Sequence, residues 1–197
     1  MGRQMSRLGC AAGIAAVLLI ASPMAHADGN AGLKAYQAGD YATALKEFLP
    51  LAEAGQASAQ AAVGQMYLDG LGVPKDPALA AAWLEKAAGG GNARARAQIG
   101  ALYATGTGVP QDEMKASYWL LKAANQNVRQ SQRFMALRFY AGQGVPRDLA
   151  QSFLYAALCA RQGDPEGQAL LNQLATEMSP EEKARAQALL QTWQPGN

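Results

Sequence analysis

The sequence predicts an all-α fold, a right-handed α/α superhelical solenoid built from stacked helix pairs. The first observation is a turn written three times, GLGVPKD at 70–76, GTGVPQD at 106–112 and GQGVPRD at 142–148, each copy 36 residues after the last. The second is that the segments between the turns carry apolar residues at helical spacing. Self-similarity at such a period is typical of folds in which each unit buries its apolar face only against its neighbours.

The segment before each turn has the pattern of an amphipathic helix. In the unit that begins at residue 59, residues at i, i+4, i+7 and i+8 form one apolar stripe: Ala59, Val63, Met66 and Tyr67. Gly70 suits the left-handed residue that commonly closes a helix. The proline of the turn, Pro74, cannot continue the helix, so we expect the first helix of each unit to end there.

The segment after each turn has the start and stop signals of a second helix. Asp76 is a natural N-cap, because its carboxylate can accept from free backbone N–H groups and complements the helix dipole. Pro77 follows at the first helical position, where its missing N–H does no harm. The glycine cluster at 89–91 ends the segment. Each unit is therefore predicted to be a pair of helices.

The repeat register divides the chain beyond residue 27 into five parts. Full units are predicted at 59–94, 95–130 and 131–166, and an atypical unit without the turn insertion precedes them at 28–58. Residues 167–197 depart from the pattern and are predicted to be capping helices. There Ser179 and Glu182 form an S-x-x-E capping box.

The pattern VGQMYLDGLGVPKDPALAAAWLEKAA resembles the Sel-one-like repeat (SLR) family, which is related to the tetratricopeptide repeat (TPR). The resemblance covers residues 30–178 and is specific, because two copies keep both the GxGVPxD turn and the aromatic-x-x-K-A-A segment. The third copy departs, with Tyr155 in place of Trp and Leu158-Cys159 in place of Lys-Ala. The resemblance implies a helical scaffold for protein–protein interaction. Exported relatives are associated with envelope assembly, exopolysaccharide machinery, control of sensor kinases and host contact.

Residues 1–27 have the pattern of a cleavable signal peptide. Arg3 and Arg7 form a basic start, a short apolar stretch follows, and AHA at 25–27 is a small-x-small cleavage site. We expect cleavage after Ala27 and a mature protein in the bacterial periplasm or outside the cell. The apolar stretch is too short for an ordinary membrane-spanning helix.

The composition left after such cleavage argues against most catalytic chemistry. The signal segment holds His26, the one histidine, and Cys10, so the mature chain would have no histidine and a single cysteine, Cys159. Serine or cysteine triads and the usual zinc sites are therefore not expected. The carboxylate pairs Asp112/Glu113 and Glu181/Glu182 stand at predicted helix starts, where acids complement the helix dipole. We predict no enzyme activity, no cofactor and no metal site.

Charge gives no sign of a nucleic-acid partner. Loss of Arg3 and Arg7 would lower the count of Lys and Arg from 17 to 15, equal to the 15 Asp and Glu. A neutral chain lacks the basic footprint of a protein that binds nucleic acid or an anionic membrane. Cys159 aligns with Ala87 and Ala123, so we expect a buried, unreactive thiol.

The candidate partner-binding surface lies on the first helices, which line the concave side of such a solenoid. Three positions per unit are predicted to be free for a partner, and in the third unit all three become large and apolar, with arginines beside them. The partner-binding candidates are Arg133, Phe134, Leu137, Arg138 and Tyr140. Aromatic residues beside arginine are typical of interface hot spots. The alternative is that Phe134 and Tyr140 form core beneath the C-terminal cap, and Arg138 is expected at an edge.

Three functions stay open at this point. The favoured one is a scaffold or regulatory adaptor that holds an envelope protein, or a peptide from one, on the concave face. The first alternative is a penicillin-binding or β-lactamase-like hydrolase, as described for cysteine-rich members of the resembled family. The second is a binder of glycan or peptidoglycan strands. The oligomeric state is not predicted.

Overall fold

The structure is a computed structural model that describes residues 29–196; the predicted signal peptide, its cleavage site, Cys10 and His26 lie outside the described residues. Within this range the chain forms ten α-helices and no strand. The helices are α1 (Gly29–Gln37), α2 (Tyr41–Glu53), α3 (Ala57–Asp69), α4 (Pro77–Gly89), α5 (Ala93–Thr105), α6 (Glu113–Asn125), α7 (Arg129–Ala141), α8 (Leu149–Arg161), α9 (Pro165–Glu177) and α10 (Pro180–Thr192).

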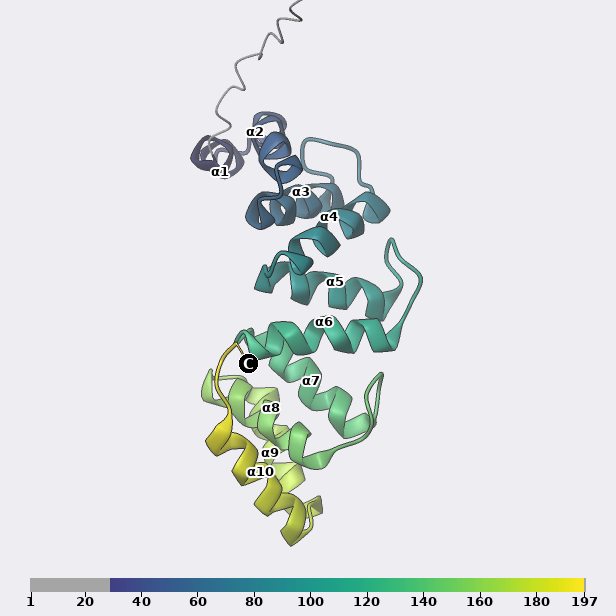
Figure 1. Ribbon diagram of the computed structural model, residues 1–197, viewed down its shortest axis with the longest axis vertical. Coiled ribbons are helices and arrows are strands. Elements are labelled where there is room, and N and C mark those ends of the chain that lie inside the picture. The colour runs from purple at the N-terminus through teal and green to yellow at the C-terminus, as the bar shows by residue number, and fades with distance from the viewer. Residues whose placement is uncertain (1–28, 197) are drawn as a thin grey trace, which may run out of the picture.

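The helices stack in chain order into an elongated solenoid, as predicted (Figure 1). Each helix from α1 to α8 packs against the next one in the sequence, and α10 turns back to pack against α8. The pairs α3/α4, α5/α6 and α7/α8 are the helix pairs of the three repeats. The first helices of the pairs follow one another along the stack, and so do the second helices.

The repeated turn has the same backbone in all three copies. Gly70, Gly106 and Gly142 follow the first helices with φ of 74°, 70° and 72°, the left-handed conformation predicted for them. A backbone hydrogen bond then closes each turn, for example from the N–H of Asp112 to the carbonyl of Tyr103 at 2.9 Å. The turn thus returns the chain to the end of the helix that it has just left.

The second glycine of the turn is required by contact between units. At Gly108 a Cβ would overlap the carbonyl group of Pro77, at the start of the second helix of the preceding unit. Gly144 lies in the same way against the carbonyl group of Glu113. The turn therefore packs its backbone directly on the neighbouring unit, which only a residue without a side chain permits.

The predicted helix caps are present. The carboxylates of Asp76, Asp112 and Asp148 accept hydrogen bonds from backbone N–H groups in the first turns of α4, α6 and α8. Ser179 and Glu182 form the reciprocal capping box at the start of α10. These bonds satisfy N–H groups that have no partner inside the helix.

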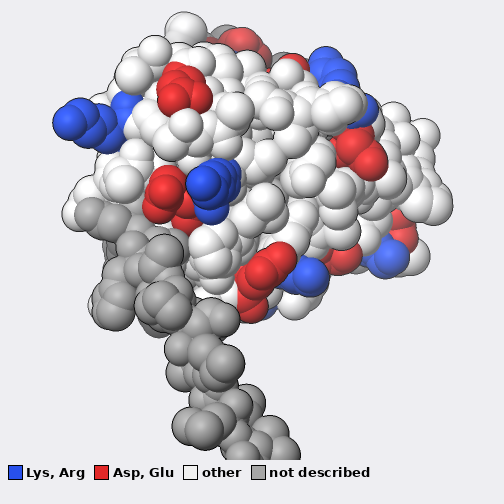
Figure 2. Space-filling view, turned by 90° about the horizontal axis from the view of Figure 1, so that it is seen from above, with Lys and Arg blue, Asp and Glu red and all other residues white. Residues whose placement is uncertain are grey.

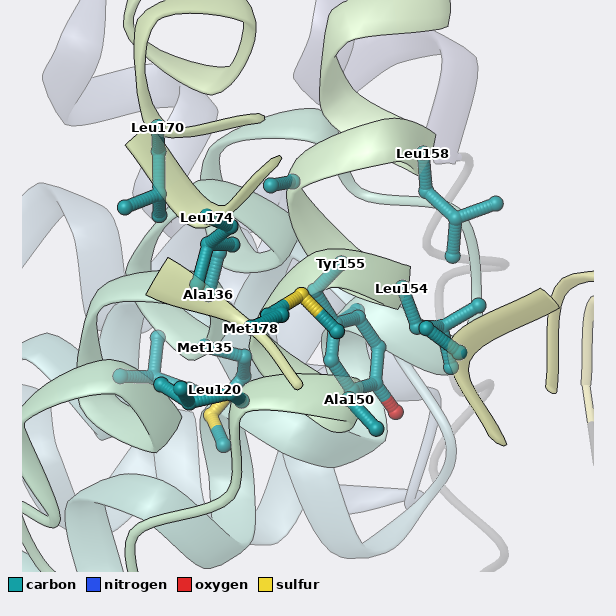
Figure 3. Close-up of a cluster of buried hydrophobic side chains, with 14 residues drawn as sticks. Leu120, Met135, Ala136, Ala150, Leu154, Tyr155, Leu158, Leu170, Leu174 and Met178 are labelled. Carbon is teal, nitrogen blue, oxygen red and sulfur yellow. The ribbon is translucent and has the colours of Figure 1, made fainter. Parts of the chain in front are cut away.

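Buried apolar side chains form three clusters that succeed one another along the stack. The C-terminal cluster joins α6 to α10 and holds Met135, Tyr155, Leu174 and Met178 (Figure 3). The cover provided by α10 explains a difference between units: Ala150 and Leu154 of α8 are buried, while the equivalent Met114 and Tyr118 of α6 are 73% and 53% exposed.

Candidate functional site

The face formed by the first helices contains two neighbouring hollows. The first has a volume of about 230 Å³ and lies among α1, α2, α3 and α5. The second, of about 530 Å³, lies among α5, α6 and α7. Arg94 and Gln98 of α5 line both hollows, so the two form one groove that crosses the atypical first unit and the three repeats.

Small residues make the groove. Ala62 of α3 lines the first hollow and Ala97 and Ala101 of α5 line the second, so the floor lies close to the helix backbones. Larger apolar side chains stand beyond them. The first hollow ends on Leu33, Tyr36 and Phe48, and the second on Leu120, Val128 and Phe134.

Three positions in each unit are predicted to be free, and residues at the first two line the groove or are exposed. They are Ala62, Gln98 and Phe134, then Gln65, Ala101 and Leu137; all but Leu137 line the groove, and Leu137 is 44% exposed. Residues at the third position line neither hollow. Leu68 and Ala104 are partly buried against one core cluster and Tyr140 against another, and Ala62 and Phe134 of the first position are partly buried in the same way.

The polar residues of the groove are incompletely paired. Gln98 donates to Gln65, whose amide in turn donates to Asp69 at 2.5 Å. Arg94 is exposed and makes no hydrogen bond, ion pair or ring contact with a described residue. Gln98 Oε1 and Ser131 Oγ are buried without a hydrogen-bond partner among the described residues.

The predicted partner-binding candidates of α7 divide into three environments. Phe134 is half-buried at the end of the second hollow, and Leu137 is exposed beside it. Arg133 is engaged within the chain, because its Nη1 lies 2.9 Å from Glu166 and 3.6 Å from Asp164. Its guanidinium also lies 5.6 Å from the ring of Phe134. Phe134 and Leu137 are therefore the members of the set that offer apolar surface.

Tyr140 is joined to the C-terminal cap. Its hydroxyl donates to the carboxylate of Glu177 at 2.9 Å and accepts from the amide of Gln173 at 2.7 Å, both on α9. The hydrogen bond to Glu177, together with partial loss of solvent, raises the pKa of Tyr140 above its ordinary value. The side chain thus ties α7 to α9.

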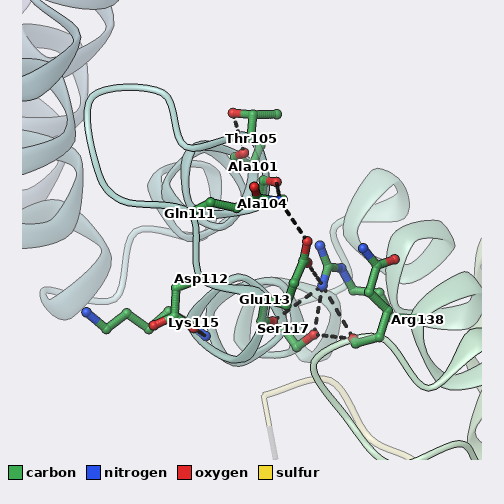
Figure 4. A network of polar contacts seen from close by, with 10 residues as sticks. Ala101, Ala104, Thr105, Gln111, Asp112, Glu113, Lys115, Ser117 and Arg138 are labelled. Carbon is green, nitrogen blue, oxygen red and sulfur yellow. Dashed lines mark hydrogen bonds and ion pairs between the residues drawn. The ribbon is translucent and has the colours of Figure 1, made fainter.

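Arg138 is buried, so the expectation that it lies at an edge was wrong (Figure 4). Its Nη1 donates to Glu113 Oε2 at 2.9 Å and to Ser117 Oγ at 3.1 Å, both on α6. Burial alone would raise the pKa of Glu113, but hydrogen bonds from Arg138 and Gln111 outweigh it and hold the pKa below its ordinary value.

The sequence did contain a signal for this pair. Arg138 stands where the earlier units have Met66 and Leu102, and its partner Glu113 stands where the preceding second helix has Pro77. Ser117 likewise replaces Ala81. Polar residues thus replace apolar ones on both sides of the α6–α7 interface. The repeat alignment reveals this only when the first helix of one unit is compared together with the second helix of the unit before it.

Groups that could perform chemistry are engaged in structure. Burial raises the pKa of the Cys159 thiol to about 11, with a smaller contribution from the charge of Asp164. Asp112 caps α6, Glu113 pairs with Arg138, and Glu182 closes the capping box of α10. Within residues 29–196 no cluster of His, Cys, Asp and Glu has the arrangement of a metal site.

Acidic and basic side chains are mixed at the end of the molecule that carries α1 and α2 (Figure 2). Viewed from the end that carries α1 and α2, acidic and basic side chains alternate, without a large patch of one sign (Figure 2). In the described part of the chain, no helix has the length and apolar character needed to cross a bilayer.

Comparison with known proteins places the chain in a family. The model of the Sel1 repeat matches residues 57–92, 93–128 and 129–164. No curated protein matches the sequence. Among solved structures, a Sel1 repeat protein from Oxalobacter formigenes is similar with a TM-score of 0.70 and 28% identity, over 73% of this chain and 59% of that one.

A second similar structure is a protective antigen of uropathogenic Escherichia coli strains that displays an SLR fold. Its TM-score is 0.69 at 26% identity, over 84% of this chain and 38% of the antigen. This chain thus matches less than two thirds of the length of either structure. The three matched repeats and the stacked helix pairs show that the chain belongs to the Sel1 repeat family.

Proposed function

We propose that this protein is an exported, non-enzymatic scaffold or regulatory adaptor of the bacterial cell envelope. Sel1 repeat proteins are helical-repeat scaffolds that typically mediate protein–protein interaction. The observation that carries the proposal is the groove shared by α3, α5 and α7. It joins two hollows over the atypical first unit and the three repeats and has apolar side chains at both ends, which suits an extended segment of a partner protein.

Export is part of the proposal and rests on the pattern of residues 1–27. The test is mass spectrometry of the protein recovered from the periplasmic fraction and the medium. We expect the chain to begin at Asp28. A chain that keeps its first residues and stays with the cytoplasmic fraction would contradict export.

The absence of catalysis is supported by what the candidate groups do. The chain beyond Ala27 has no histidine, and Cys159 is fully buried with a raised pKa. Cysteine-rich relatives staple their repeats with cysteine pairs, whereas one cysteine stands in this part of the chain. Nitrocefin turnover by the pure protein tests the hydrolase alternative, and saturable hydrolysis would overturn the proposal.

Binding in the groove can be tested inside cells by photo-crosslinking. A photoreactive amino acid is placed at Gln65 or Ala101, which line the first and second hollows. Tyr118 of α6 is the matched control, because it is exposed but lines neither hollow.

We expect the same envelope protein to be captured from Gln65 and Ala101 and not from Tyr118. Capture from Tyr118 alone would move the partner to the second helices and contradict the proposed face. If no position captures a protein and peptidoglycan fragments copurify instead, the glycan alternative takes its place.

A further inference from the structure

We propose that the groove recognises an extended partner segment with an internal Asp or Glu, whose carboxylate pairs with Arg94 while apolar residues on either side fill the two hollows. This inference rests on the proposed function and specifies the chemistry of the partner. Three observations carry it: the charge of the groove, its unpaired polar atoms, and the position of Arg94 between the hollows.

Among residues 29–196, Arg94 is the one charged residue that lines the hollows. No Asp or Glu is among the residues that line either of them. Other arginines on the first helices are engaged: Arg133 with Glu166, Arg138 with Glu113, and Arg96 with the carbonyl of Ala88. Arg94 alone among these has no partner in the described part of the chain, and a carboxylate matches its planar fork of donors.

Two further polar atoms are unsatisfied where the groove is lined. Ser131 is fully buried at the wall of the second hollow and its Oγ has no hydrogen-bond partner among the described residues. Gln98 Oε1, between the hollows, is likewise buried without a hydrogen-bond partner among the described residues. Buried polar atoms usually have partners, and Gln98 Oε1 can accept from a backbone N–H of a bound segment. The groove therefore offers hydrogen bonds as well as charge.

The position of Arg94 favours an internal acidic residue over a chain terminus. Arg94 and Gln98 line both hollows, and apolar side chains stand beyond each of them, Tyr36 on one side and Phe134 on the other. A terminal carboxylate at Arg94 would leave one hollow empty. A segment that passes through uses both, and alternate side chains of an extended chain can enter them.

The probe is a random peptide library displayed on phage and selected on the chain that begins at Asp28. Selection is repeated on Arg94→Gln. Arg161→Gln is the matched control, because Arg161 is exposed and lines neither hollow. Ala62→Trp and Ala101→Trp fill one hollow each. Helical content and thermal unfolding confirm that every variant is folded.

We expect the selected peptides to share one central Asp or Glu flanked by apolar residues. Arg94→Gln should weaken a selected peptide by about tenfold or more, since a charged hydrogen bond is lost, while Arg161→Gln leaves binding unchanged. Arg94→Glu should restore affinity for the peptide in which the acid is replaced by Lys. Ala62→Trp and Ala101→Trp should both abolish binding.

The outcomes separate this inference from the proposed function. Peptides that are blocked by the tryptophan variants but lack an acid, or ignore Arg94→Gln, would overturn the inference and leave the scaffold proposal standing. If no peptide is selected, or if the tryptophan variants have no effect on binding, the groove is not the binding face and both fail. Sedimentation decides a further case: a dimer that Ala101→Trp dissolves would make a second copy the occupant and overturn the inference.

Discussion

Cys159 illustrates how the repeat register assigns a role to a single residue. It stands where the two preceding units have Ala87 and Ala123, and all three side chains are fully buried. Its Sγ lies against Gly167 of α9, where a Cβ would overlap it. The thiol is thus a small packing group at the α8–α9 contact, and its raised pKa follows from that burial.

We predict that the folded protein resists thiol alkylation at neutral pH. At neutral pH a pKa of about 11 leaves roughly one three-hundredth of the thiolate that a free thiol of pKa about 8.5 would have. Because the folded pKa is raised, the thiol's contribution to stability is complete below about pH 8.5, the unfolded value, and is lost as the pH rises through about 11. Iodoacetamide labelling followed by mass spectrometry should modify Cys159 only after urea unfolding. Rapid labelling of the native chain would contradict a buried thiol.

A second prediction at this scale concerns Gly108. Substitution by Ala adds the strain of a positive φ, 72°, to the overlap with the carbonyl of Pro77. Gly163 is the matched control, because its φ is 79° and nothing lies within 4 Å of a Cβ there. Gly163→Ala should lower the free energy of unfolding by about 1 kcal/mol, and Gly108→Ala by roughly 3 kcal/mol. Equal losses in urea unfolding would show that contact between units does not demand the second glycine.

At the scale of elements, the α6–α7 interface differs from the two before it. The earlier first helices present Met66 and Leu102 to the preceding unit, whereas α7 presents Arg138 to Glu113 and Ser117. A buried ion pair contributes little net stability, because desolvation offsets attraction, but removing one partner strands the other charge. The pair therefore specifies which helix α7 packs against, and adds little to the free energy of unfolding.

We predict that removing the arginine and removing the carboxylate of this pair change the free energy of unfolding by different amounts. Arg138→Met restores the residue type of the first unit and should change the free energy of unfolding by less than about 1 kcal/mol. Glu113→Ala leaves Arg138 buried without its carboxylate and should cost about 3 kcal/mol. Urea unfolding of both variants at neutral pH checks this, and a larger loss from Arg138→Met than from Glu113→Ala would contradict it.

The lowered pKa of Glu113 adds a dependence on pH. A depressed folded pKa means that the carboxylate stabilises the fold above its unfolded value of about 4.3, and that this contribution is lost as the pH falls below it. The wild type should therefore lose more stability than Arg138→Met between about pH 5 and pH 3. If the free energy of unfolding falls equally with pH in the two proteins, the ion pair is not the cause of the pH dependence.

At the scale of the whole molecule, the sequence predicted most of the fold and less of the site. The turns, caps and helix pairs recur in the repeat register, so local rules applied to one copy hold for all three. The groove cannot be predicted from one repeat, because Arg94 and the alanines around it form a shared wall only when the first helices α1, α3, α5 and α7 are stacked. Tyr140 shows the same limit: its role is set by α9, which lies outside the repeat pattern.

The return of α10 to α8 leads to the last prediction, that the cap stabilises its neighbours and not the far end. In a solenoid each unit depends mainly on the units beside it. A chain that ends after Met178 exposes Ala150 and Leu154 of α8 and loses the ion pair between Arg185 and Asp148, at 2.6 Å. We expect hydrogen exchange to accelerate in α8 and α9, a loss of about 3–5 kcal/mol locally, while α3 and α4 keep their protection. A chain that ends after Gly196 is the control, because it keeps the hydrogen bond from the N–H of Gly196 to the carbonyl of Asn125, and it should behave as the full chain. Equal loss of protection along the whole stack would show that the ten helices unfold as one cooperative unit, in which α10 stabilises even the first repeat.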